Sequence, residues 1–146
     1  MIYSLDEIKI MASLDLEMDK TELDTESLII PQLHNKYLNF LTDEKLILVK
    51  IENDMKTLRK FKWLYYTGKL SQEELEEYEL EPFQLNILKQ DIDKFLDSDE
   101  DTITLSSRIS YQKQKVDYLE STIKMISNRQ WLIRSAIDWI KFTNGS

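Results

Sequence analysis

Apolar side chains recur at alternating steps of four and three residues through the last third of the chain. The resulting seam consists of Leu105, Ile109, Gln112, Val116, Leu119, Ile123, Ile126, Gln130, Ile133, Ile137 and Ile140. Such a regular repeat is typical of a coiled-coil-like helix, so we expect one helix over residues 102–142. The two glutamines either fix the register of the seam or mark an exposed stretch of helix.

A second apolar line runs along a different face of the same predicted helix. It repeats every seven residues through Tyr111, Tyr118, Met125, Leu132 and Trp139, about 100° beyond one edge of the first seam. A helix with two apolar lines needs two partners. We expect the first to be an antiparallel long helix, and the second to be either short helices of the same chain or another subunit. The residues expected to support self-association are Tyr118, Met125, Ile126, Leu132, Ile133 and Trp139.

Residues 27–67 carry the other long helical pattern. Its apolar positions are Leu41, Leu48, Ile51, Met55, Leu58 and Tyr65, and the charged residues Glu44 and Lys62 fill the two gaps in their spacing. The helix is expected to end before Gly68, because glycine favours the left-handed conformation that closes many helices. Pro31 fits within its first turns or marks a kink. Candidate N-terminal caps are Asp24, Thr25 and Ser27.

Short helices are expected on either side of this long one. Two capping boxes, Ser4 with Glu7 and Ser71 with Glu74, each predict the start of a short helix. The acidic run of residues 97–101 is expected to connect to the last helix and to cap it. Carboxylates favour that position because the N-terminal end of a helix is electropositive.

Composition supports a helical protein. The 146 residues include two glycines, two prolines and no cysteine, which leaves little material for hairpin turns. We therefore expect an all-α fold, a long antiparallel helical hairpin with short flanking helices, in a chain length that suits a single domain. Its expected parts are an acidic N-terminal helix and linker (1–26), a long helix with a basic end (27–67), acidic short helices with a connector (71–101) and an assembly helix (102–142).

The net charge of −8 is unevenly distributed along the chain. Residues 45–70 and 102–146 carry net charges of +5 and +4, whereas residues 1–30 and 71–101 carry −6 and −10. The two positive segments coincide with the two predicted long helices. The overall acidity therefore does not exclude binding of an anionic polymer to one of them.

Residues 55–69 form a block of basic and aromatic side chains without any acidic residue. Proteins that bind single-stranded nucleic acid combine cationic side chains, which contact phosphates, with aromatic rings, on which bases stack. On a helix, Lys56, Arg59, Lys60 and Trp63 would share one continuous stripe. The candidate DNA-binding residues are Lys56, Arg59, Lys60, Lys62, Trp63 and Lys69.

Two other interpretations of this block stay open at this point. A charged helical face is often simply solvated, and the block could instead bind an acidic partner. The glutamates of residues 73–81 follow directly, so they could fold back over the block or contact a neighbouring subunit. A membrane surface fits less well, because the surrounding acidic residues would be repelled by an anionic bilayer.

Patterns for catalysis or for a bound metal are missing from the sequence. His34 is the only histidine and there is no cysteine, so neither a catalytic triad nor a His/Cys metal site is expected. The acidic runs lack the central glycine of a calcium loop, and no glycine-rich phosphate loop is present. We therefore expect no enzymatic activity, no cofactor and no metal. Without a basic leader or an apolar run near 20 residues, we expect a cytoplasmic protein with no membrane partner.

Several of these residues also resemble those of a known family. The segment His34-Asn35-Lys36-Tyr37-Leu38, the long helix after it, and Lys60-Phe61-Lys62 running into Tyr65-Tyr66-Thr67-Gly68-Lys69 are similar to the UvsY-type recombination mediators of T-even-like tailed phages. The similarity covers residues 25–142. The Tyr-Tyr-Thr-Gly-Lys motif after a basic Lys-x-Lys is its most specific part.

The resemblance implies a small helical protein that forms a hexameric or heptameric ring and binds single-stranded DNA. It further implies that the protein helps the phage recombinase replace the single-strand-binding protein and form a presynaptic filament, in the cytoplasm of the infected host. The basic motif of the family maps onto Lys60 and Lys62. Lys56, Arg59, Trp63 and Lys69 are added from helix geometry alone.

This chain departs from the family pattern in its extended acidic N-terminus and in Phe61, where a smaller residue is expected. The alternative from another functional class is a non-enzymatic helical assembly or docking protein whose basic block binds an acidic protein partner. Such a protein would oligomerise yet show no salt-dependent affinity for oligonucleotides.

Overall fold

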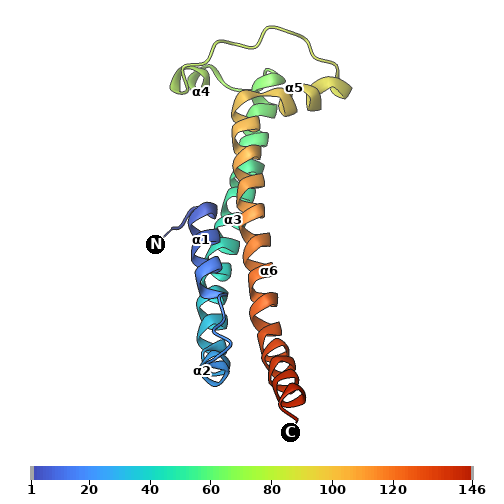
Figure 1. The fold of residues 1–146 in the computed structure, drawn as a ribbon. Coiled ribbons are helices and arrows are strands. Elements are labelled where there is room, and N and C mark those ends of the chain that lie inside the picture. The colour runs from blue at the N-terminus through green and yellow to red at the C-terminus, as the bar shows by residue number, and fades with distance from the viewer. Residues whose placement is uncertain (1, 146) are drawn as a thin grey trace. The chain divides into compact units, whose positions relative to one another are not determined.

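The computed structural model describes residues 2–145, and every regular element in that range is a helix (Figure 1). The expected all-helical class, with long and short helices, is confirmed. The elements are α1 (Leu5–Asp15), α2 (Leu23–Leu28), α3 (Ile30–Tyr66), α4 (Gln72–Glu77), the short 3₁₀ helix η1 (Lys89–Asp91), α5 (Ile92–Ser98) and α6 (Glu100–Thr143).

The chain divides into two compact units. The first comprises Met1–Leu46 with Lys113–Ser146, and the second comprises Ile47–Gln112. The long helices α3 and α6 each contribute one segment to each unit. Each short helix lies within a single unit.

The core of the first unit is built by α1, α3 and α6. Tyr37 of α3 and Leu119 and Ile126 of α6 are fully buried, together with Ile8 on the inner face of α1. The side chain of Ser4 accepts a hydrogen bond of 3.1 Å from the backbone N–H of Glu7, as its capping-box position predicts. Each large apolar side chain buried here contributes roughly 1.5–3 kcal/mol to folding.

Buried polar side chains connect the elements of this first unit. Glu44, which interrupts the apolar line of α3, is buried and lies 3.2 Å from the ammonium of Lys115 on α6. Arg129 of α6 is also fully buried, and it donates to the backbone oxygen of Asp15 at 2.9 Å and to the carboxylate of Glu26 at 2.6 Å. Arg129 therefore connects the C-terminal end of α1 and Glu26 of α2 to α6.

The second unit packs short helices against the facing ends of α3 and α6. Its buried apolar residues include Leu75 of α4 and Ile92 and Leu96 of α5. Both halves of the capping box between Ser71 and Glu74 are formed at the start of α4. Helix α5 and the start of α6 position the acidic side chains described below.

The structure differs from the sequence expectations near the start of the long helix. The segment of residues 27–67 is divided at Ile29, so that α2 ends and α3 begins there. The cap candidates Asp24, Thr25 and Ser27 are wrong: α2 starts before them, and its N-cap residue Glu22 makes no side-chain capping bond. Pro31 lies within the first turn of α3, where its missing N–H has no helical partner to lose.

Candidate nucleic-acid interface

The C-terminal end of α3 is closed by a backbone motif that places the last lysine of the basic block. Gly68 has a φ of 71°, and its N–H donates to the oxygen of Tyr65 at 3.1 Å. The N–H of Lys69 donates to the oxygen of Leu64 at 2.8 Å. This pair of bonds is the Schellman motif, which needs a residue that tolerates positive φ. It turns the chain back so that the Lys69 ammonium lies 4.3 Å from the centre of the Trp63 ring.

An exposed stripe follows the outer side of α3. Lys56, Lys60 and Trp63 are spaced four and three residues apart and are all exposed, and Lys69 extends the line past the helix end. Within residues 2–145, neither Lys56 nor Lys60 forms an ion pair or hydrogen bond through its side chain. We call these four residues the lysine–tryptophan stripe. Its cations remain available to an anionic ligand.

The other two cations of the basic block are already engaged by aspartates. The Arg59 guanidinium donates to Asp97 at 3.0 Å and lies 4.0 Å from Asp93, both on α5. The Lys62 ammonium lies 2.8 Å from Asp101 and 3.2 Å from Asp99. We call Asp93, Asp97, Asp99 and Asp101 the aspartate cluster. The six candidate DNA-binding residues therefore fall into an exposed group of four and a neutralised group of two.

Asp99 is the structural centre of this cluster. Its carboxylate accepts hydrogen bonds from the Tyr66 hydroxyl at 2.7 Å and from the backbone N–H groups of Asp101 and Thr102 at 2.9 and 3.2 Å. It therefore caps α6, as the acidic run before this helix predicts. Only 7% of its side chain and 12% of that of Lys62 are accessible to solvent.

The proton affinities of this centre follow from burial and pairing. Burial acts to raise the pKa of Asp99, but the hydrogen bonds from Tyr66, Thr102 and Lys62 outweigh it and hold the pKa below its ordinary value. Burial acts to lower the pKa of Lys62, yet Asp101 and Asp99 raise it above the ordinary value. Burial and the Asp99 hydrogen bond both raise the pKa of Tyr66. All three groups keep their neutral-pH charge states, with Asp99 and Lys62 ionised.

Tyr65 and Tyr66 pack on protein. The Tyr66 ring lies 4.9 Å from Phe83 and 5.8 Å from Phe95, and the Tyr65 hydroxyl donates to the backbone oxygen of Glu81 at 2.8 Å. Phe61 contacts the Tyr78 ring at 4.8 Å. Trp63 is therefore the ring of the basic block that remains accessible for stacking.

The acidic residues that cover the basic block were only partly predictable. The sequence suggested that the glutamates of residues 73–81 could fold back over it, but the ion pairs in the described part of the chain come from the aspartate cluster instead. The signal for Lys62 was its position in a gap of the apolar line, because a charged residue there needs a buried partner. Nothing local to Arg59 indicated a partner on α5.

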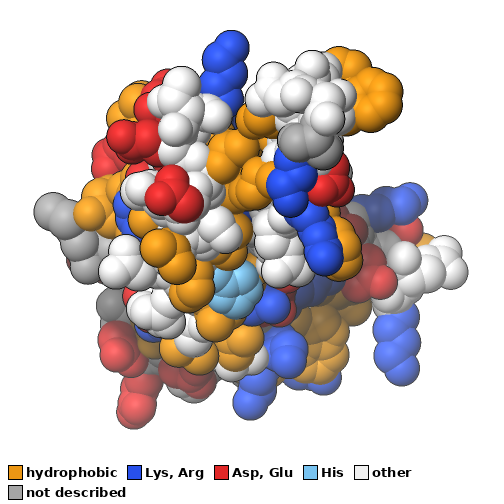
Figure 2. Space-filling model, turned by 60° about the horizontal axis from the view of Figure 1, so that its bottom comes forward, with side chains coloured by type: hydrophobic (Ala, Val, Ile, Leu, Met, Phe, Trp, Pro, Cys, Tyr) orange, Lys and Arg blue, Asp and Glu red, His pale blue; other side chains and the backbone are white. Residues whose placement is uncertain are grey.

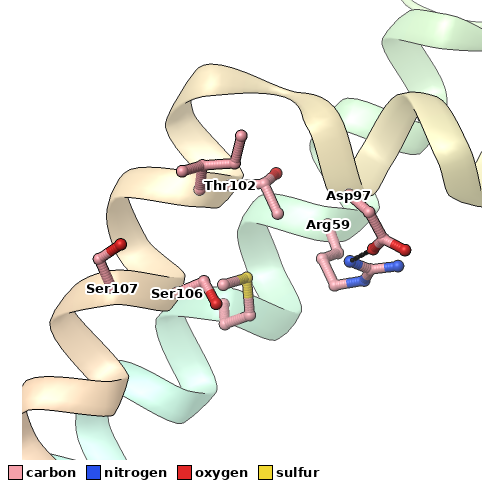
Figure 3. Close-up of a pocket in the computed structure, with 7 residues that line it drawn as sticks. Arg59, Asp97, Thr102, Ser106 and Ser107 are labelled. Atoms are coloured by element: carbon pink, nitrogen blue, oxygen red, sulfur yellow. Dashed lines mark hydrogen bonds and ion pairs between the residues drawn. The ribbon is translucent and has the colours of Figure 1, made fainter.

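A pocket lies beside Arg59 in the second unit (Figure 3). It has a volume of about 320 Å³ and is lined by Met55, Arg59, Asp97, Thr102, Ile103, Ser106 and Ser107. The guanidinium of Arg59 and the carboxylate of Asp97 lie together at one side, and Ser106 and Ser107 project from α6 (Figure 3). The buried hydroxyl of Thr102 has no hydrogen-bond partner among the described residues.

The candidate assembly residues separate into a buried and an exposed set. Ile126 and Ile133 are buried inside the first unit, and Tyr118 is half-buried with the Lys9 ammonium 6.0 Å from its ring centre. By contrast Met125, Leu132 and Trp139 are 52%, 50% and 65% exposed. On the face that it presents, Figure 2 shows hydrophobic side chains open to solvent among charged ones.

The seam of α6 is buried only along part of its length. Burial extends from Gln112 to Ile133, whereas Ile137 and Ile140 are exposed at 37% and 43%. Gln130 is also exposed, so it marks an exposed stretch and does not fix the register of a packed seam. The buried polar residue at this level is its neighbour Arg129, which the heptad pattern did not single out.

The described residues contain neither a metal-binding cluster nor a membrane-spanning helix. No cluster of acidic or histidine side chains in that range has an arrangement that could hold a metal ion. None of the described helices combines the length and hydrophobicity of a membrane-spanning segment.

Comparison with known proteins assigns the chain to a family. Residues 11–146 match the family model described as the recombination, repair and ssDNA binding protein UvsY. The chain belongs to the UvsY family. The resemblance noted from the Tyr-Tyr-Thr-Gly-Lys motif is thereby confirmed, and the UvsY match extends further towards the N-terminus than residue 25. A comparison with curated protein sequences gave no match.

Solved structures support the same UvsY-type fold. Two crystal structures of the bacteriophage T4 recombination mediator protein UvsY, in lattice types II and IV, superpose with TM-scores of 0.84 and 0.79 at 21% and 20% identity. These matches cover 98% and 97% of this chain and 99% of the T4 chain in each case. A third, in lattice type I, has a TM-score of 0.76 at 21% identity over 92% of this chain and 97% of the T4 chain.

Proposed function

We propose that this chain is a recombination mediator that binds single-stranded DNA through the lysine–tryptophan stripe and helps load a recombinase onto DNA covered by single-strand-binding protein. The observation that carries the proposal is the stripe itself: two exposed lysines without a partner in the described chain, next to an exposed Trp63, in a family described as ssDNA binding. No catalytic step is part of this function.

The physical basis of binding is sequence-independent. Each phosphate neutralised by a lysine releases condensed counterions, so affinity falls as salt rises. A base stacked on Trp63 would add roughly 1–3 kcal/mol whatever its identity. That base would displace the Lys69 ammonium from the ring face and leave it free to contact the adjacent phosphate. A mediator has to act on any sequence, and these contacts do not select one.

Self-association would multiply this weak surface. A few phosphate contacts per chain bind feebly at physiological salt, whereas linked sites along one strand gain from a high effective concentration. We propose that Met125, Leu132 and Trp139, exposed on one line of α6, contact a second copy of the chain. Tyr118 lies at the edge of this contact, and the buried Ile126 and Ile133 support it from within. A closed ring of six or seven subunits is the assembly we propose.

The residues of the basic block then take two roles. Lys56, Lys60, Trp63 and Lys69 contact DNA directly, and Lys60 is the residue indicated both by helix geometry and by the family motif. Lys62 holds α3 against the start of α6 through Asp99, which positions the stripe. The rival function is a docking protein for an acidic partner, and it is favoured by the ion pairs that the block already makes with aspartates.

The two functions are separated by the salt dependence of oligonucleotide binding. Fluorescence anisotropy of a labelled oligothymidine would be measured at several salt concentrations for the wild type, Lys60→Ala and Lys50→Ala. Lys50 is the matched control, since it carries the same charge on α3 but pairs with Asp54 at 3.4 Å, away from the stripe. Lys60→Ala should lower the slope of log affinity against log salt by about 0.7 per contacting subunit.

Lys50→Ala should leave that slope unchanged. Equal slopes for wild type and Lys60→Ala would refute the stripe as the DNA site. Absence of any salt-dependent binding in the wild type would favour the docking protein. Loading would be tested by recombinase filament formation on DNA covered by single-strand-binding protein, which Lys60→Ala should slow and Lys50→Ala should not.

A further inference from the structure

Arg59 differs from Lys62 in how firmly its aspartates hold it. The side chains of Asp97 and Asp93 are 70% and 86% exposed, and the Arg59 side chain is 37% exposed. An ion pair between such exposed groups contributes little to stability and exchanges readily. The side chains of Lys62 and Asp99 are instead only 12% and 7% exposed, and Asp99 is also fixed by Tyr66 and by the backbone of α6. Of the two neutralised cations, only Arg59 is free to change partner.

The position of Arg59 connects it to the stripe. It lies four residues before Trp63 on α3, one turn or roughly 6 Å away along the helix axis. It therefore borders the stripe on the side that faces α5 and α6. A strand that stacks a base on Trp63 would bring a neighbouring phosphate within reach of the Arg59 guanidinium.

The pocket beside Arg59 offers further donors for an anion. The exposed residues Ser106 and Ser107 line it with hydroxyl groups, whereas the hydroxyl of Thr102, which also lines it, is buried. Its volume of about 320 Å³ is roughly ten times the share of one liquid water, so it admits a phosphate group. A guanidinium presents a planar fork of donors that fits phosphate oxygens as it fits a carboxylate.

We propose that the Arg59 pocket is a phosphate subsite for single-stranded DNA. When DNA is absent, the Asp97 carboxylate pairs with the Arg59 guanidinium in place of a phosphate. This inference rests on the proposed function and adds a site to it. DNA and the α5 aspartates compete for one cation: the phosphodiester displaces Asp97, which moves into solvent with Asp93. The aspartates thereby lower the affinity for DNA and make release easier.

The competition is tested by removing the competitor. Asp97→Asn, alone and combined with Asp93→Asn, would be compared with Asp54→Asn, which changes the charge equally on the opposite side of α3 from the stripe. Asp97→Asn should bind oligothymidine roughly twofold to fivefold more tightly per subunit, the range that corresponds to an exposed ion pair. Asp54→Asn should bind as the wild type, and circular dichroism should show all of the variants folded, because these side chains are exposed.

A double-mutant cycle assigns the effect to Arg59. Arg59→Ala should lower the salt slope by about 0.7 per contacting subunit, and in that background Asp97→Asn should no longer tighten binding. The inference is overturned if Asp97→Asn and Asp54→Asn bind alike, or if Asp97→Asn still tightens binding without Arg59. If either result is found while Lys60→Ala binds DNA more weakly than the wild type, the proposed DNA-binding stripe stands and only the proposed Arg59 subsite is refuted. If Lys60→Ala also bound as the wild type, the proposed function would fail first.

Discussion

Replacement of Asp99 by alanine tests the junction that positions the basic end of α3. The substitution removes the N-cap of α6, which costs about 1 kcal/mol, and leaves the part-buried Tyr66 hydroxyl without its acceptor, at a further cost of about 1–3 kcal/mol. It also removes the buried partner of Lys62, although Asp101 remains 2.8 Å away to compensate part of that charge. Together these effects predict a loss of about 2–4 kcal/mol in the free energy of unfolding.

Asp99→Asn is the matched control for this prediction. Asparagine is as good an N-cap as aspartate, because its one side-chain oxygen can still accept from the N–H groups of Asp101 and Thr102. Its amide nitrogen cannot accept from Tyr66 or pair with Lys62, so asparagine loses these two contacts but keeps the cap and should lose less stability than alanine. Both values would be measured by urea denaturation followed by circular dichroism. An Asp99→Ala variant within about 0.5 kcal/mol of the wild type would refute the role of the junction. Equal losses in the two variants would show that the oxygen facing Tyr66 and Lys62 matters and that the cap does not.

Three further outcomes are expected. Ile126→Asp should lower the free energy of unfolding, measured with urea or heat, by several kcal/mol because it buries an unpaired charge. Gln130→Asp, at an exposed position, should lower it little, and similar losses in the two variants would contradict the buried seam. Leu132→Asp should leave the chain helical but lower its mass in sedimentation, and an unchanged mass would remove the proposed subunit contact. Because the folded pKa of Asp99 is below its ordinary 3.8, its ionic contribution is complete above that pH and is lost as the pH falls through the lowered value. The stability gap between wild type and Asp99→Asn should therefore narrow in urea titrations below about pH 3.8, and a constant gap would contradict the ion pair.

Helix ends could be predicted because their chemistry is local. The side chains of Ser71 and Glu74 each accept a hydrogen bond from the backbone N–H of the other residue, three positions away. Gly68 supplies the left-handed backbone conformation that the end of α3 requires. Asp99 caps α6 for the same kind of reason. Such features depend on neighbours along the chain, so the sequence contains all the information that they need.

Pairs between distant segments could be anticipated only in part. Glu44 and Lys62 interrupt an apolar line, which shows that each needs a buried partner but not that the partners are Lys115 and Asp99. The sequence did not indicate that Arg129 is buried, because the heptad spacing of the α6 seam falls on its neighbour Gln130. The partners are chosen by tertiary packing across more than 30 residues, and periodicity within one helix carries no information about that choice.

The exposure of the lysine–tryptophan stripe is likewise a tertiary result. Helix geometry grouped Arg59 with Lys56, Lys60 and Trp63, but the short helix α5 places Asp97 and Asp93 over Arg59 alone. Helix spacing therefore grouped the four residues, but it could not show which of them acidic side chains neutralise.

The fluorescence of Trp63 tests the central claim most directly. The chain has three tryptophans, so a Trp131→Phe, Trp139→Phe variant leaves Trp63 as its only tryptophan. Because Trp139 lies in the proposed subunit contact, the variant is used only if its mass in sedimentation equals that of the wild type. If bases stack on Trp63, unlabelled oligothymidine should quench this emission in step with binding measured by anisotropy, and added salt should restore it. Emission that stays constant while the oligonucleotide binds would show that DNA lies elsewhere on the protein and would contradict the account.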